Sequence, residues 1–227
     1  MTKHLKLFTS DSERKSFESS NNYVEPYVSI VRGGGGKIDT HYNLVPDIKL
    51  IMKDSSIKRF FVNSDSVDFS SFSAYHQDID FSNVKGVEFS DRITEISNIT
   101  TISGLEELII PNSVKKIDTS YIYALIYLKK VVLPNTINSL KSGTFNSCFN
   151  LESVTLTDSL THIDADTFNG CYNLQELKII GKKDISSLLP TNLTDNLTEL
   201  YIDASLVETY KTYRDSIGKT FEVKSLT

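Results

Sequence analysis

The chain has few of the residues that define several common functional classes. Only two of its 227 residues are cysteines and four are histidines, which argues against a disulfide scaffold and against a metal centre. No stretch is apolar for long enough to cross a bilayer. The net charge is −5 and there is no long basic run, which argues against nucleic acid or an anionic membrane as a partner. We therefore expect a globular protein with no cofactor, no nucleic-acid partner and no membrane insertion.

Motifs for catalysis and nucleotide binding are also missing. The four glycines at 33–36 lack the spacing of a phosphate-binding loop or a dinucleotide fingerprint, and we interpret them as a flexible turn. The string HIDAD at 162–166 brings a histidine near two carboxylates, but Asp is an ordinary turn residue and the string lies in a loop frame. No serine elbow and no Cys/His nucleophile frame is found. We expect the protein not to be an enzyme.

A repeat of 23 residues dominates the sequence. Four full units begin at Leu105, Leu128, Leu151 and Leu174, and a partial unit begins at Leu197. The first, fourth and sixth positions of each unit are apolar, which is the pattern of a short strand whose alternate side chains enter one core. Because one unit cannot bury these side chains alone, the units must stack, with their strands about 4.8 Å apart in a parallel ladder.

Three further apolar columns run through the first three units. They contain Val114, Ile137 and Leu160; Ile117, Leu140 and Ile163; and Ile122, Phe145 and Phe168. With these columns, the strings LEELIIPNSVKKI, LKKVVLPNTINSLKSGTFNSCFN and LESVTLTDSLTHIDADTFNGCYN resemble the BspA-like leucine-rich repeats. The resemblance implies a leucine-rich-repeat solenoid with a short parallel β ladder and a far side that is irregular or 3-10 helical.

The sequences on both sides of the repeats complete a predicted division into four parts. Residues 1–43 form a small β-rich N-terminal module for assembly or attachment, with a hairpin around the glycines. Residues 44–104 form degenerate repeats and an N-terminal cap, and residues 105–196 form the four repeats. Residues 197–227 form a C-terminal cap, with a helix over about 205–217 followed by a strand. Ser205 and Glu208 have the spacing of a capping box at the start of that helix.

The N-terminal segment suggests where the protein acts. It resembles, in the form LF-x-T … Y-x-x-P-x-V-S-x-V … H-Y-N, a module found on proteins of gut anaerobes and their tailed phages. The start of the chain lacks the apolar segment of a secretory signal peptide. The two resemblances imply a non-enzymatic structural or binding protein of a tailed-phage virion, assembled in the host cytoplasm. The alternative is a bacterial or protist BspA-like adhesin at the cell surface.

Two surfaces are candidates for contact with a partner. An apolar ridge across three units would contain Tyr121, Tyr123, Ile126, Tyr127, Phe149 and Tyr172. It is either a partner surface or a patch that a neighbouring loop covers. A concave face of the ladder would contain Glu107, Ile109, Lys130, Val132, Thr155, Glu176, Lys178, Glu199 and Tyr201. The expected partners are other virion proteins or a host-surface protein or glycan, and a homo-oligomer is compatible with either surface.

Two structural columns follow from the same frame. Cys148 and Cys171 occupy one position of successive units, at a spacing that does not exclude a disulfide. Leu125 fills this position one unit earlier, which favours free thiols that serve as small apolar side chains. A polar column of Asn150, Asn173 and Asn196 is expected to bond the backbone of the turns.

Overall fold

A computed structural model describes residues 46–62, 64–117, 122–190, 193 and 195–226. Before them it describes the backbone of four strands, β1 (Leu5–Phe8), β2 (Tyr23–Val24), β3 (Val28–Arg32) and β4 (Ile38–Asp39). Strands β1, β3 and β4 form one small sheet, in which β3 and β4 run antiparallel on either side of the glycines. The predicted N-terminal module comprises residues 1–43, and apart from these four strands it lies outside the described residues.

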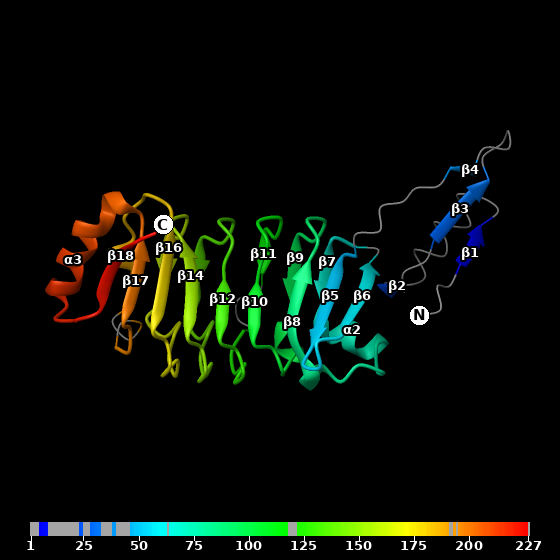
Figure 1. The fold of residues 1–227 in the computed structure, drawn as a ribbon, viewed down its shortest axis with the longest axis horizontal. Helices are drawn as coiled ribbons and strands as arrows, with labels where there is room; N and C mark the ends of the chain where they lie inside the picture. Colours follow the sequence, from blue (N-terminus) through cyan, green and yellow to red (C-terminus); the bar gives the residue numbers. More distant parts are fainter. Residues whose placement is uncertain are drawn as a thin grey trace.

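A ten-stranded sheet runs along the length of the repeats (Figure 1). Its order is β18-β17-β16-β14-β12-β10-β8-β5-β6-β2. Beyond β2, its strands are β5 (Ile48–Met52), β6 (Ile57–Val62), β8 (Val84–Phe89), β10 (Glu107–Ile109), β12 (Lys130–Val132), β14 (Ser153–Thr157), β16 (Glu176–Ile180), β17 (Glu199–Ile202) and β18 (Glu222–Ser225). All neighbouring pairs from β8 to β18 are parallel. We call these seven strands the ladder.

The register of the ladder equals the period of the sequence. Glu107 pairs with Lys130 and Lys130 with Ser153, each 23 residues on. Equivalent positions of successive units therefore stand side by side. Leu105, Leu108 and the corresponding residues of later units are buried beneath the ladder. Each fully buried aliphatic side chain of this kind contributes about 1.5–3 kcal/mol relative to its exposed state.

The sheet departs from the repeat order at its N-terminal end. Degenerate repeats were predicted for residues 44–104, which would put β6 next to β8, but β5 lies between these two strands. Strand β5 runs antiparallel to both neighbours, and its register shifts between Ile51 and Met52. The alternating burial of Ile48, Leu50 and Met52 explains why this segment joins the sheet, because it continues the core beneath β8.

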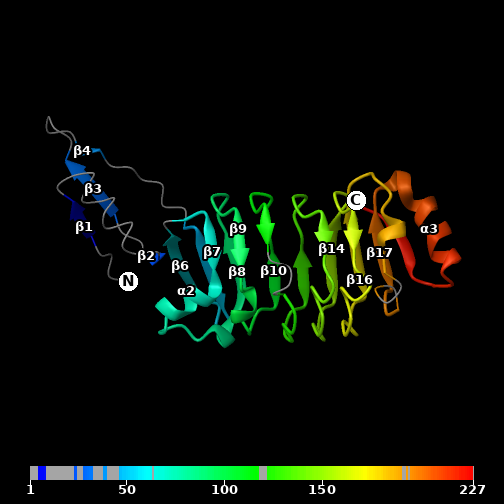
Figure 2. The same ribbon diagram turned by 180° about the vertical axis from the view of Figure 1, so that it is seen from behind.

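The far side of the repeats combines short strands, which were not predicted, with turns around Phe145 and Phe168, where irregular structure was predicted (Figure 2). Two small parallel sheets are formed by β7 (Ser66–Asp68), β9 (Glu95–Ser97) and β11 (Lys116–Ile117), and by β13 (Ser139–Leu140) and β15 (His162–Ile163). The apolar column through Leu140 and Ile163 is buried while the residues before it face outward, and this alternation favours strand pairing. Turns of 3-10 type occur elsewhere, at η1 (Phe81–Asn83), η2 (Ile99–Thr101), η4 (Ser186–Leu188) and η6 (Ala204–Leu206).

Two helices lie near the ends of the ladder, α2 (Phe69–Tyr75) and α3 (Val207–Ser216). The capping box expected at Ser205 and Glu208 does not form. Instead Asp203 accepts hydrogen bonds from the backbone and hydroxyl of Ser205, and α3 starts after this turn. Tyr210 of α3 is fully buried, and its hydroxyl accepts a hydrogen bond from the Ile185 amide. The helix thus covers the apolar side chains at the C-terminal end of the repeats.

Candidate functional site

The outward face of the ladder is formed by the third and fifth positions of each unit. The third positions are Gly86, Glu107, Lys130, Ser153, Glu176, Glu199 and Glu222, and the fifth positions are Glu88, Ile109, Val132, Thr155, Lys178, Tyr201 and Lys224. All nine residues predicted for the concave face lie here in consecutive strands. We call this surface the ladder face. Side chains one strand apart are close enough to form cross-strand pairs.

Polar side chains at the C-terminal end of the ladder face bind one another. Lys224 Nζ lies 2.5 Å from Glu199 and 3.0 Å from Glu222. The Tyr201 hydroxyl donates to Glu199 over 2.7 Å, and Lys178 and Lys224 both lie over the Tyr201 ring. Charges and ring form a closed network in which each group has a partner from this chain.

The network shifts the ionisation of its carboxylates. The hydrogen bond from Lys224 is the main reason why the pKa of Glu199 is lowered. Burial alone would raise the pKa of Glu176, but the hydrogen bonds from Ser153 and Lys178 outweigh it, so this pKa is also lowered. The bond to Glu199 raises the pKa of the Tyr201 hydroxyl. The carboxylates of Glu176 and Glu199 are therefore ionised at neutral pH, and the Tyr201 hydroxyl keeps its proton for the bond to Glu199.

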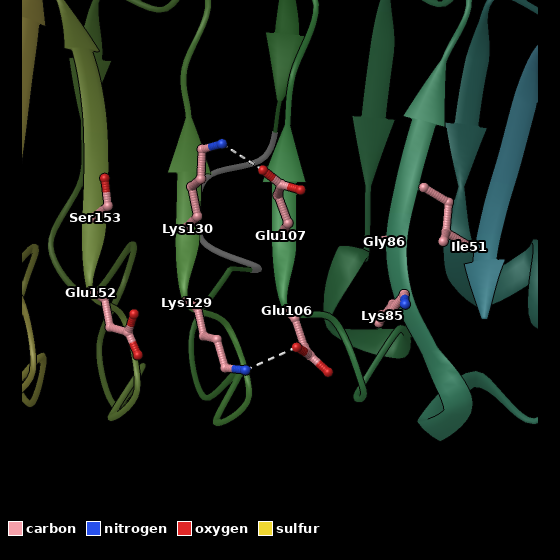
Figure 3. Close-up of a pocket in the computed structure, with 9 residues that line it drawn as sticks. All are labelled: Ile51, Lys85, Gly86, Glu106, Glu107, Lys129, Lys130, Glu152 and Ser153. Atoms are coloured by element: carbon pink, nitrogen blue, oxygen red, sulfur yellow. Dashed lines mark hydrogen bonds and ion pairs between the residues drawn. The ribbon is translucent and has the colours of Figure 1, made fainter. Parts of the chain in front are cut away.

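The N-terminal end of the ladder face is hollowed. A shallow depression of about 490 Å³ lies over β5, β8, β10, β12 and β14 (Figure 3). It is lined by Ile51, Lys85, Gly86, Glu106, Glu107, Lys129, Lys130, Glu152 and Ser153. We call it the Gly86 depression, because Gly86 has no side chain at a position where the other strands of the ladder have one.

Gly86 is not required by the backbone at this position. Its φ lies outside the left-handed region, and a Cβ placed on it would meet Ile51 Cδ1 at 3.4 Å, an ordinary contact. A glycine inside a strand weakens the strand and often marks a place where another molecule approaches closely. Ile51, Lys85 and Gly86 were not among the residues predicted for a site. The signal in the sequence was a glycine at the third position, where the other units have a residue with a side chain.

A row of alternating charges borders the depression. It consists of Lys85, Glu106, Lys129 and Glu152, each immediately before the third position of its unit (Figure 3). Lys129 bonds Glu106 at 3.0 Å, and this bond is the main reason why the pKa of Lys129 is raised. Across the same strands Lys130 bonds Glu107 at 2.6 Å. Within the described part of the chain, the two outer members of the row, Lys85 and Glu152, form no ion pair.

The predicted ridge is partly assembled. Tyr121 lies outside the described residues, whereas Tyr123, Ile126, Tyr127, Phe149 and Tyr172 are exposed, Tyr172 by 68%. The rings of Phe149 and Tyr172 stack with centroids 6.1 Å apart and planes within 5°. Lys53 lies 4.8 Å from the Tyr127 ring centroid, so this tyrosine already has a cation neighbour. The exposed ridge is therefore centred on the pair Phe149 and Tyr172.

The turns that carry the ridge are held by the asparagine column. Asn150 Nδ2 donates to the Ile126 carbonyl over 2.7 Å, and Asn173 Nδ2 donates to the Phe149 carbonyl over 2.9 Å. Among the residues that the structure describes, no equivalent bond joins Asn196 to the Tyr172 carbonyl. Two members of the predicted column thus fix turns one unit apart.

Cys148 and Cys171 are buried as free thiols. Their Sγ atoms donate to the carbonyls of Ile122 and Phe145, each 26 residues earlier. Burial raises the pKa of Cys148 to about 11 and that of Cys171 to about 12. Thiols with such pKa values carry little thiolate at neutral pH and are poor nucleophiles and metal ligands.

Neither metal-binding groups nor membrane-spanning helices are found in the described residues. No cluster of three or more His, Cys, Asp or Glu side chains within them could hold a metal ion. None of the helices described is both long and apolar enough to cross a membrane. His162, from the string HIDAD, lies 3.1 Å from Asp164, which also accepts from the Ser142 amide over 2.8 Å. Asp164 thus has the role of a turn residue.

Comparison with known proteins agrees with this geometry over the repeats. Residues 101–213 match the family described as BspA type leucine rich repeat region, in six copies. The repeats in this range are similar to that family. A leucine rich cell surface protein from Faecalibacterium prausnitzii A2-165 is similar over 74% of this chain and 45% of its own length, with 12% identity and a TM-score of 0.34. The chain thus spans less than half the length of that protein. No curated protein matches the sequence significantly.

Proposed function

We propose that the protein is a non-enzymatic binding module of a cell-surface adhesin, in which a BspA-type solenoid presents its ladder face to a partner protein. The observation that carries this proposal is the Gly86 depression. It combines apolar surface at Ile51 with charged groups at Lys85 and Glu152 that have no ion-pair partner in the described chain. Repeat proteins commonly bind their partners on such extended faces, and BspA-type repeats supply this one.

The ladder face supports a binding role better than a catalytic one. Its ionisable groups lie in an open, shallow surface, and the inner ones are held in ion pairs. Catalysis usually needs a deeper site in which a nucleophile or base is freed from such pairs and water is excluded. A partner protein needs only complementary charge and shape, and it gains most where the chain leaves charges unpaired.

A role in a tailed-phage virion was the leading interpretation of the sequence, and the comparisons favour the cell-surface alternative. The family match covers the repeats and does not include the N-terminal segment on which the virion interpretation rests. The ridge around Phe149 and Tyr172 is a second candidate contact surface under either interpretation. Its rings stack on each other, and Asn173 holds the turn that carries Phe149, so a partner would lose little backbone entropy by ordering that turn.

The test is binding of the purified, fluorescently labelled chain to one array of extracellular protein domains and one array of glycans. We expect binding to protein features that Gly86→Val abolishes, because valine fills the depression. The matched control is Ser225→Val, which puts the same side chain on an exposed position of β18. Binding that survives Gly86→Val, or binding to glycans alone, would contradict the proposal. Thermal melts of both variants confirm that they fold.

A further inference from the structure

The charge row has a direction that a partner would have to match. Its cationic end is Lys85 on β8 and its anionic end is Glu152 before β14, with the bonded pair of Glu106 and Lys129 between them (Figure 3). Lys129 bonds Glu106 and is also influenced by the charge of Glu152. The row therefore ends in a cation and a carboxylate that form no ion pair with another described residue. Lys85 Nζ lies 3.5 Å from the Ser55 hydroxyl, and its charge also helps to lower the pKa of the neighbouring Asp54. A ligand that pairs with both ends must carry a negative group at one end and a positive group at the other.

The spacing of the two ends fits a particular ligand backbone. Lys85 and Glu152 are three strands apart in the ladder, which is about 14 Å at the usual strand spacing. In an extended peptide, residues i and i+4 project on the same side and are about 13 Å apart. A peptide that crosses the ladder at right angles to its strands therefore places an acidic residue at Lys85 and a basic residue, four positions later, at Glu152.

The apolar part of the depression extends this match by one position. Ile51 lies on β5, on the side of Gly86 that faces away from β10. A residue two positions before the acidic one projects to the same side of the peptide, about 7 Å further along. This displacement exceeds one strand spacing, so it carries the residue from β8 to β5, where it meets Ile51. An aliphatic side chain packs there against Ile51, whose own side chain lies over Gly86.

We propose that the Gly86 depression recognises an extended segment of a partner protein with the pattern apolar-x-acidic-x-x-x-basic, oriented from β5 to β14. The inference rests on the proposed function and specifies its ligand. Charge complementarity selects this occupant. A neutral glycan would leave Lys85 and Glu152 unpaired, and a uniformly charged polymer would be repelled at one end of the row.

The experiment uses the full chain and two labelled peptides measured by fluorescence anisotropy. The probe is acetyl-Leu-Ser-Glu-Ser-Ser-Ser-Lys-amide, and the control peptide has its Glu and Lys exchanged. We expect the probe to bind about five-fold more tightly than the control at low salt, a ratio that two exposed ion pairs can give. The preference should shrink as salt is raised.

A charge-exchanged protein provides the matched control. The double variant Lys85→Glu with Glu152→Lys keeps the net charge and should reverse the preference, so that the control peptide binds more tightly. Equal affinities, an unchanged preference in the double variant, or binding of neither peptide would overturn the inference. The proposed function would still stand if the protein array showed binding that Gly86→Val abolishes, so failures of the two proposals are distinguishable. A thermal melt checks that the double variant folds despite the like charges placed beside Glu106 and Lys129.

Discussion

The two ends of the ladder face satisfy their charges in different ways. At the C-terminal end Glu199, Tyr201 and Lys224 bond one another across β17 and β18. At the N-terminal end Gly86 interrupts the column, and Lys85 lacks an ion pair among the described residues. Both ends pair equivalent positions of parallel strands and have the same kind of core. The difference comes from a few outward side chains and from β5, which joins the sheet antiparallel beside β8. It teaches that a repeat surface is open to a partner where its cross-strand pairs are incomplete.

The largest expected effect tests whether the two ends share equivalent support. Leu108 is buried beneath β10, near the depression, and Leu200 is buried beneath the network of Glu199, Tyr201 and Lys224. Each leucine is replaced by alanine. Each substitution should lower the free energy of unfolding by about 2–5 kcal/mol, because it removes buried apolar contact and leaves a cavity. Urea denaturation followed by circular dichroism measures the loss. A large loss at one position with little at the other would show that the core differs too.

The second prediction concerns the melting temperature after one charge is removed from the closed network, compared with one removed from the open end. Glu199→Gln should lower the melting temperature at pH 6, because it removes the carboxylate that Lys224 and Tyr201 bind. The pKa of Glu199 is lowered from its ordinary 4.5. Its stabilising contribution is therefore complete above pH 4.5 and is lost as the pH falls through the folded-state pKa. The gap between the wild type and Glu199→Gln should thus close on acidification toward pH 3.

Glu152→Gln is the control for this prediction. Glu152 belongs to the same surface but forms no ion pair in the described structure, so its substitution should leave the melting temperature at pH 6 nearly unchanged. Melting curves of both variants and the wild type between pH 3 and pH 6 make the comparison. Equal losses from the two substitutions would mean that the closed network does not stabilise the fold more than the open row does.

The features that follow the 23-residue repeat could be predicted from the sequence, and those outside the repeat could not. The columns of leucine and valine every 23 residues predict the parallel ladder, and the ladder in turn places Glu199, Tyr201 and Lys178 on one face. Periodicity alone suffices for these residues, because equivalent positions of stacked units must be neighbours. The closed network follows from the repeat once the identities at the third and fifth positions are known.

The open end could not be predicted in this way. The Gly86 depression depends on Ile51, which reaches β8 only because β5 inserts antiparallel between β8 and β6. Strand β5 lies outside the repeat frame, and no periodic signal specifies its partner. The far-side strands were missed for another reason. They are only two or three residues long, so their alternation is too short to distinguish from a turn without the neighbouring unit.

The third prediction extends the same comparison to the turns. Asn173→Ala should lower the free energy of unfolding by about 0.5–1.5 kcal/mol, since it removes the bond that Nδ2 donates to the Phe149 carbonyl. Asn196→Ala is the matched control, because Asn196 lacks the equivalent bond to the preceding unit, and its effect should be smaller. Urea denaturation of both variants gives the two values. A larger loss at Asn196 would show that the asparagine bonds are not what fixes these turns.

The smallest effect on stability, and the sharpest test of the open end, is expected for Gly86→Ala. The new Cβ would meet Ile51 at ordinary contact distance, and alanine restricts the unfolded chain more than glycine does. Stability should therefore stay equal or rise by up to about 1 kcal/mol. Binding of the peptide probe should weaken, because the methyl group lies against Ile51 and reduces the apolar surface that the aliphatic side chain of the probe contacts. A variant that is more stable and yet binds less would show that the glycine is kept for the partner rather than for the fold. Unchanged binding together with lower stability would show the opposite, that Gly86 serves the packing of Ile51.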